Sequence, residues 1–133
     1  MNGHTGELES ISKKYPNVII HKSVERMSEL MCDCDIAVTA GGTTLYELCA
    51  CGLPSICFSW ADNQIQAVSV FTKMGLMIGA GDIRNDSDKC ISAVVDGLKM
   101  YCGDHKMRVY CGERLKSLVD GLGVGRICEI LKK

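Results

Sequence analysis

The chain has 133 residues, of which 47% are hydrophobic and 23% are charged, and its formal net charge is −1. This composition predicts one soluble domain with a hydrophobic core, and it excludes the strongly basic surface that nucleic acid or an anionic membrane would require. No apolar run approaches the length of a membrane span, so we expect no membrane insertion, and any bound nucleotide should be a small molecule.

Nine cysteines are an odd number for a disulfide framework, and the sequence contains no Cys-x-x-Cys pair. Several have apolar neighbours, namely Cys49, Cys57, Cys90 and Cys128. We therefore predict reduced, buried cysteines that bind no metal. Together with a polar N-terminus that lacks a signal peptide, they predict a cytoplasmic protein.

Apolar residues recur at helical spacing between Thr5 and Lys14, which predicts an amphipathic helix. The short apolar run from Val18 to His21 is predicted to be a strand. Ser23 is a suitable N-cap for a second helix, from Val24 to Cys32.

Apolar runs and helical segments alternate along the rest of the chain. Buried strands are predicted at 36–39, 55–58 and 76–78, and helices at 65–74, 89–101, 105–119 and 125–131. Asp86 or Ser87 can cap the helix that begins at residue 89. The alternation predicts an α/β fold, a Rossmann-like parallel sheet with flanking helices.

Two consecutive glycines, Gly41 and Gly42, separate the strand at 36–39 from a short helix. Glycines let the backbone approach a ligand closely, and the N-terminus of the following helix attracts an anion. The turn Trp60 to Gln64 leaves the next strand at the same edge of the sheet, where parallel α/β proteins bind their ligands. A pyrophosphate with attached hydroxyl groups suits this edge.

The same residues also have purely structural interpretations. A glycine pair serves many strand-to-helix turns, and Thr44-x-x-Glu47 matches a capping box. Asp62-Asn63-Gln64 can cap the following helix, and Trp60 is either the wall of a crevice or part of the core. The combination of these features is more specific than any one of them.

That combination resembles the C-terminal domain of GT-B-fold nucleotide-sugar enzymes. The similarity rests on Gly-Gly-Thr-Thr-x-Tyr-Glu at 41–47, Ala-Asp-Asn-Gln at 61–64, Gly-Leu-Met-Ile-Gly at 75–79 and Val-Asp-Gly-Leu-Gly at 119–123, and it covers nearly the whole chain. The sequence is most similar to the UDP-sugar hydrolase of pseudaminic acid biosynthesis and its spore-coat polysaccharide relatives. It is more distantly similar to the peptidoglycan N-acetylglucosaminyltransferase.

The resemblance implies that Gly41-Gly42-Thr43 contacts the diphosphate of UDP and that Glu47 binds the ribose hydroxyls. Asn63 and Gln64 would reach the β-phosphate and the sugar, with Asn63 nearest the breaking bond. In the hydrolases water attacks the anomeric carbon and UDP leaves. The glycine turn would stabilise the leaving group, and no metal or other cofactor is implied.

The sequence departs from the family in two respects. The family's catalytic histidine lies in a Gly-x-Gly-His segment of an N-terminal domain, and Asn2-Gly3-His4 does not match that segment. If 18–21 and 36–39 are the third and fourth strands, the two strands between them in the family's sheet are missing. Residues 1–133 would then be a partial UDP-sugar-binding domain, completed by an N-terminal domain or by a second copy of the chain.

The sequence therefore predicts the UDP-binding portion of a nucleotide-sugar hydrolase that is inactive alone. Two alternatives remain open at this stage. The chain can be the donor-binding half of a UDP-sugar glycosyltransferase, or a noncatalytic nucleotide-binding or assembly module.

Overall fold

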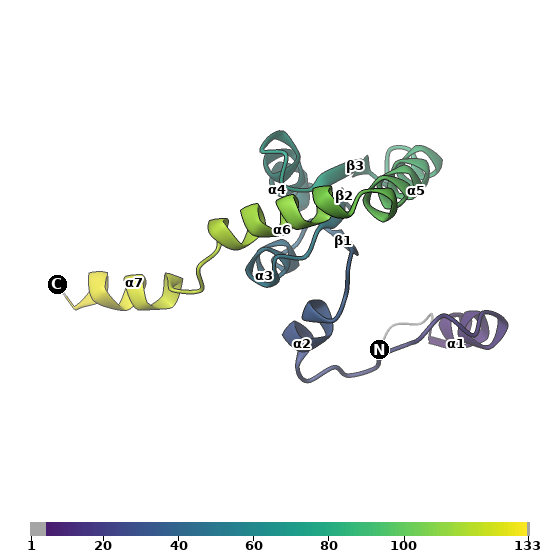
Figure 1. Cartoon of the computed structure of the whole chain (residues 1–133), viewed down its shortest axis with the longest axis horizontal. Helices are drawn as coiled ribbons and strands as arrows, with labels where there is room; N and C mark the ends of the chain where they lie inside the picture. The colour runs from purple at the N-terminus through teal and green to yellow at the C-terminus, as the bar shows by residue number, and fades with distance from the viewer. Residues whose placement is uncertain (1–4, 133) are drawn as a thin grey trace.

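A computed structural model describes residues 5–132, so that Asn2-Gly3-His4 lies outside the described residues. Three strands, β1 (Ala37–Ala40), β2 (Ser55–Ser59) and β3 (Ile78–Asp82), form a parallel sheet in the order β1-β2-β3 (Figure 1). The register between β2 and β3 shifts between Cys57 and Ser59. The α/β class and the Rossmann-like parallel sheet are thus confirmed.

Helices cover both faces of this sheet. Helices α3 (Thr44–Cys51) and α4 (Asp62–Lys73) pack on one face, and α5 (Ser87–Gly103) packs on the other. In β2, Ile56 and Cys57 are both fully buried, because successive side chains of a strand point to opposite faces and both faces are covered. Each face therefore has its own hydrophobic cluster.

Helix α6 (His105–Leu118) packs against α3 at close range. A Cβ atom on Gly112 of α6 would lie 2.6 Å from the carbonyl oxygen of Gly52. Gly52 ends α3 with φ of 66°, a left-handed conformation that favours glycine. Two glycines thus allow the backbones of α3 and α6 to meet, and Leu115 fills the core beside them with no exposed surface.

The predicted strand at Val18 to His21 is wrong. These residues have no regular secondary structure, and Ile19 is 76% exposed. In the described part of the chain nothing pairs with the outer edge of β1, and a short apolar run without a neighbouring strand has no partner for its backbone groups. The three strands are contiguous in the sheet, and the two further strands that the family resemblance implies beyond β1 stay a prediction.

Several boundaries also differ from the predictions. The second helix, α2 (Met27–Cys32), begins after Arg26, because Ser23 has a positive φ of 53° and does not cap it. The third strand lies two residues later than predicted, and Leu76 and Met77 are instead buried in the connection that precedes it.

Other predictions are confirmed. Helix α1 spans Thr5–Lys14, and Asp86 caps α5 by accepting a hydrogen bond of 2.9 Å from the Lys89 N–H group. Helices α6 and α7 (Gly123–Leu131) match the predicted helical C-terminus.

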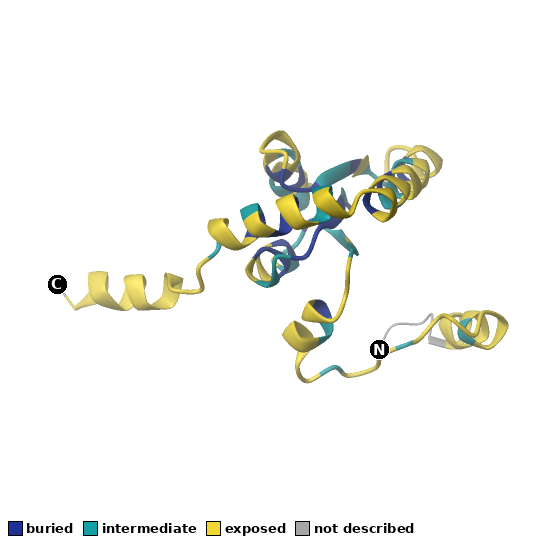
Figure 2. Ribbon diagram, in the orientation of Figure 1, coloured by how far each residue is buried: buried dark blue, intermediate teal, exposed yellow. Residues whose placement is uncertain are grey.

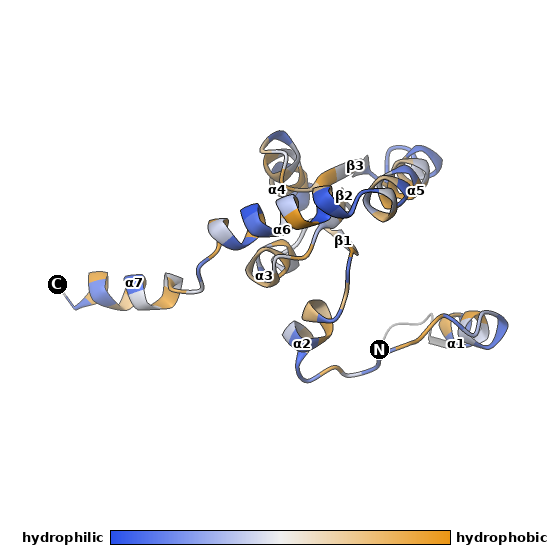
Figure 3. Cartoon of the chain, viewed as in Figure 1, coloured by the Kyte–Doolittle hydropathy of each residue, from blue (hydrophilic) through white to orange (hydrophobic). Residues whose placement is uncertain are grey.

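Helices α1 and α7 lie at opposite ends of the molecule, away from the sheet (Figure 1). The residues of α7 are exposed (Figure 2), although several of them are strongly hydrophobic (Figure 3). Ile127, Ile130 and Leu131 are the largest of these. None of the described helices combines the length and the apolar composition needed to cross a membrane.

All nine cysteines are unpaired thiols. Cys49, Cys57, Cys90 and Cys111 are buried, as is typical of small hydrophobic core residues. Burial raises the pKa of the Cys49 thiol to about 11. Cys128 was expected to be buried, but it lies exposed on α7.

Candidate functional site

The Gly41-Gly42 turn follows β1 at the carboxyl edge of the sheet, but its own N–H groups are already bonded. The Gly41 N–H donates to the carbonyl of Phe58 at 2.8 Å, which extends the ladder between β1 and β2. The Gly42 N–H donates to the carbonyl of Ala40, also at 2.8 Å. These two groups are therefore not available to a ligand.

The two glycines differ in what surrounds them. A Cβ atom on Gly41 would overlap the Cγ2 atom of Val68 and would lie 3.2 Å from the carbonyl oxygen of Gln64. Apart from the adjacent residues, no heavy atom of the described chain lies within 4 Å of the corresponding position on Gly42. Gly41 is thus required for the packing of α4 against the turn, whereas Gly42 faces open space.

The unpaired donors of this turn belong to the next two residues. Thr43 is the N-cap of α3 and makes no side-chain capping bond. Leu45 and Tyr46 donate to the carbonyls of Gly42 and Thr43, whereas within the described residues the N–H groups of Thr43 and Thr44 reach no acceptor. Two free N–H groups at the positive end of a helix dipole form a site for an anion.

Glu47 does not form the capping box, since the N-cap of α3 makes no side-chain bond. Its side chain is exposed and lines a groove of about 330 Å³ between α3 and α2. Met27, Ser28 and Met31 form the opposite wall of this groove. Glu47 thus lies beside α2, one helical turn away from Thr43.

Asp62-Asn63-Gln64 forms the first turn of α4, which begins three residues earlier than predicted. The N-cap is Ala61, and the Oε1 atom of Gln64 accepts a hydrogen bond of 2.9 Å from the Trp60 N–H. The side chain of Gln64 therefore has a structural role at this helix start, while its NH₂ group donates to no acceptor among the described residues. Trp60 is 63% exposed and so does not belong to the core.

The structure brings some of the predicted site residues together and leaves one apart. Gly41 lies directly against Gln64, so that the starts of α3 and α4 are neighbours at the carboxyl edge. The structure brings the glycine turn and the Asp62-Asn63-Gln64 turn to one edge, and it leaves Glu47 on the flank next to α2.

Arg84, which the sequence analysis did not single out, links two strand-to-helix connections at this edge. Its guanidinium contacts Asp82 at 2.7 Å and Asp62 at 2.8 Å. The hydrogen bonds from Arg84 hold the pKa of the Asp82 carboxyl below its usual range. Because Asp82 ends β3 and Asp62 starts α4, this network links the first turn of α4 to the end of the sheet. The sequence signal for this network is Asp-x-Arg at 82–84, but the predicted strand ended at residue 78, four residues before Asp82.

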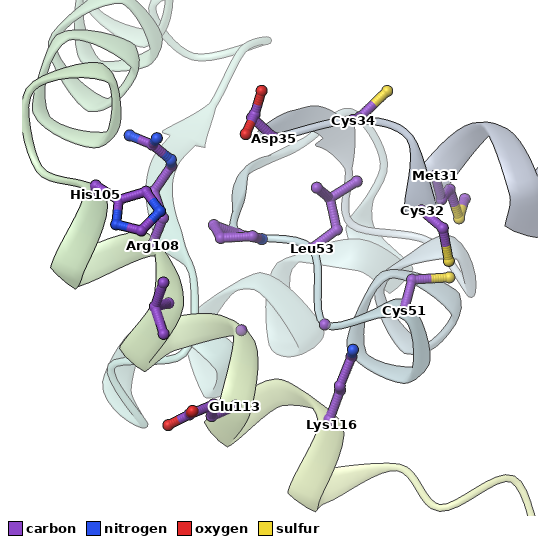
Figure 4. Close-up of a pocket in the computed structure, with 14 residues that line it drawn as sticks. Met31, Cys32, Cys34, Asp35, Cys51, Leu53, His105, Arg108, Glu113 and Lys116 are labelled. Carbon is purple, nitrogen blue, oxygen red and sulfur yellow. The ribbon is translucent and has the colours of Figure 1, made fainter.

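A separate cavity of about 300 Å³ lies at the opposite edge of the sheet (Figure 4). Cys34 and Asp35 line it just before β1, and Leu53 and Pro54 line it just before β2. His105 and Arg108 of α6 form another part of the wall. Because the cavity is at the amino ends of the strands, it is distinct from the Gly41 turn.

Comparison with known proteins adds one relative. The chain is 26% identical over 122 residues to the spore coat polysaccharide biosynthesis protein SpsG of Bacillus subtilis (strain 168), a match that covers 90% of this chain and 34% of that protein. The chain is thus similar to a polysaccharide biosynthesis protein. It spans about a third of that relative's length. No model of a known family matches the chain, and no solved structure matches it.

This similarity supports the spore-coat relatives that the motifs indicated. It does not distinguish them from the UDP-sugar hydrolase of pseudaminic acid biosynthesis, which stays a prediction.

Proposed function

We propose that this chain forms the UDP-binding part of a nucleotide-sugar hydrolase that releases UDP from a UDP-linked amino sugar. The observation that carries the proposal is the pair of N–H groups of Thr43 and Thr44, which reach no acceptor among residues 5–132 and lie next to the open space at Gly42. The similarity to a spore coat polysaccharide biosynthesis protein supports a nucleotide-sugar role.

In this proposal the diphosphate of UDP accepts hydrogen bonds from the N–H groups of Thr43 and Thr44. The start of α4 lies beside this position, so a second helix N-terminus adds positive potential. Negative charge grows on the diphosphate as the bond to the sugar breaks. Donors that are already in place stabilise that charge without reorganisation.

The proposed binding mode gives roles to three side chains, those of Glu47, Asn63 and Gln64. Thr43 and Glu47 are four residues apart on one face of α3, which places Glu47 about 6 Å along the helix axis from Thr43. The ribose hydroxyls would then bind Glu47 in the groove beside α2. Asn63, in the exposed first turn of α4, and the free NH₂ group of Gln64 would lie toward the β-phosphate and the sugar.

The base that activates water is proposed to come from the N-terminal domain that the family resemblance implies. The chain alone should therefore bind UDP but release almost none from a UDP-sugar. Appreciable turnover by the isolated chain would contradict this part of the proposal.

Binding can be tested with one matched pair of variants. Thr43 has φ of −60°, which proline adopts, so T43P removes the N–H donor, whereas T43A removes only the side chain. One lost hydrogen bond to a charged group corresponds to roughly 1.5–3 kcal/mol, so T43P should weaken UDP binding about 10- to 100-fold. T43A should bind nearly as well as the wild type, as measured by calorimetry.

Inorganic pyrophosphate serves as a second probe, because it tests the diphosphate contacts without the ribose contacts. E47A should weaken the binding of UDP while leaving that of pyrophosphate unchanged. UDP titration followed by NMR should shift the amides of Gly42, Thr43 and Glu47. Unchanged amides at saturating UDP would favour the noncatalytic assembly module instead.

A further inference from the structure

Two cysteines from different helices meet in the cavity at the amino ends of the strands. Cys32 is the last residue of α2 and is exposed, whereas Cys51 is the last residue of α3 and is half-buried. Both line the cavity of about 300 Å³, together with Cys34. The cavity opens to solvent beside α6, so a small molecule can reach the thiols.

The thiols of Cys32 and Cys51 are neighbours in this cavity. Their sulfur atoms lie side by side in Figure 4, and after burial the neighbouring Cys32 thiol is the next cause that raises the pKa of Cys51. The Sγ atom of Cys51 also lies 3.9 Å from the carbonyl oxygen of Ser28 on α2, within the range of a weak S–H hydrogen bond. The sulfur of Cys34 points away from this pair (Figure 4).

Helix α2 is joined to the rest of the fold by few contacts. It has six residues, of which only Met31 is buried, and it packs against α3. The chain before it, from Tyr15 to Arg26, has no regular secondary structure. A covalent bond between Cys32 and Cys51 would therefore fasten a weakly held helix to the core of the domain.

We propose that Cys32 and Cys51 form a reversible dithiol–disulfide site that takes a small-molecule disulfide as its oxidant. The exposed Cys32 thiolate attacks one sulfur of the small disulfide, which gives a mixed disulfide and releases one small thiol. The Cys51 thiolate then attacks the Cys32 sulfur, and the second small thiol leaves. The two cysteines lose two electrons and two protons in total, and one small disulfide becomes two thiols.

The disulfide would form without a large movement of the chain, since the two thiols already lie side by side. It would close a loop of about 20 residues that contains β1 and the Gly41 turn, and cross-linking a loop of this length restricts the unfolded chain. The expected effect is a rise of roughly 5–10 °C in melting temperature. It would also hold α2 against α3 along the groove that Glu47 lines.

The experiment uses the full chain and oxidised glutathione as the probe. Cleavage on the amino side of aspartate releases residues 1–32, the dipeptide Asp33-Cys34 and residues 35–61 as separate peptides, so that Cys32 and Cys34 are resolved. Mass spectrometry should find residues 1–32 linked to the peptide that carries Cys51. Fragmentation then distinguishes Cys51 from Cys49 and Cys57.

C34S serves as the matched control, because it removes a neighbouring cysteine of the same cavity. C34S should still form the link and show the rise in melting temperature, and a reducing agent should reverse both. C32S, which changes an exposed residue, should accumulate no link and keep the melting temperature of the reduced protein. The proposal is overturned if folded wild-type protein leaves Cys32 and Cys51 unlinked, or if Cys34 rather than Cys32 is linked to Cys51.

Discussion

Replacing each of the two adjacent glycines by alanine should change stability in opposite directions. In G41A the new methyl group would overlap Val68 Cγ2 and approach the carbonyl oxygen of Gln64 to 3.2 Å. Val68 is buried on α4, and a β-branched residue in a helix has one strongly preferred rotamer, so it cannot turn away. The first turn of α4 would have to move, and overpacking of this kind costs about 1–3 kcal/mol.

In G42A the new methyl group meets nothing within 4 Å, and the φ of Gly42 is not in the left-handed region. Alanine reduces the conformational entropy of the unfolded chain, which stabilises a protein by about 0.4–1 kcal/mol at such a position. The free energies of unfolding of the two variants should therefore differ by roughly 1.4–4 kcal/mol.

Urea unfolding followed by far-ultraviolet circular dichroism measures both variants against the wild type. A G41A protein as stable as G42A would refute the packing explanation of Gly41. UDP binding is a second measurement that distinguishes G42A from the wild type. The G42A methyl group occupies the open space of the proposed diphosphate site, so this variant should bind UDP more weakly despite its stability.

Three other predictions concern the core, a helix cap and acid stability. L115A removes a fully buried side chain and should cost about 2–5 kcal/mol in urea unfolding. D86A removes the N-cap of α5 and should cost about 1 kcal/mol in the same assay. Because Arg84 lowers the pKa of Asp82 in the folded state, the stabilisation from this carboxylate is present above the ordinary aspartate pKa of about 4 and is lost as the pH falls through the lowered value. D82N should therefore be less stable than the wild type at pH 7, and the difference should shrink in acid. A difference that persists unchanged at low pH would contradict this account.

The alternation of strands and helices was predictable because it depends on local pattern. Caps and periodicity located α1 and α5 closely, and the continuous apolar runs located β1 and β2 within one residue at each end. The same reasoning failed at Val18 to His21. A strand needs a neighbouring strand for its backbone groups, and pairing of that kind is not visible in a short apolar run.

The third strand shows how packing overrides local preference. Ile78–Asp82 contains two glycines, which disfavour strands, so the local pattern placed the strand at the more apolar Leu76–Ile78. In the structure a Cβ atom on Gly79 would overlap the Thr72 hydroxyl of α4. The glycine lets a helix pack closely on the strand, and that requirement comes from tertiary structure.

The position of the candidate site was predictable, whereas its donors were not. A strand, a glycine pair and a helix indicate where the chain turns, but each N–H is bonded or free according to neighbours that the local sequence does not reveal. Gly41 and Gly42 donate to Phe58 and Ala40. In the described part of the chain, the N–H groups without an acceptor belong to the two threonines that follow. Any residue except proline can supply such a donor, so the threonine side chains carry little of the signal. Gly41 is needed for the close packing of α4 against the turn. The proposed anion site begins at Thr43, the residue after the two glycines.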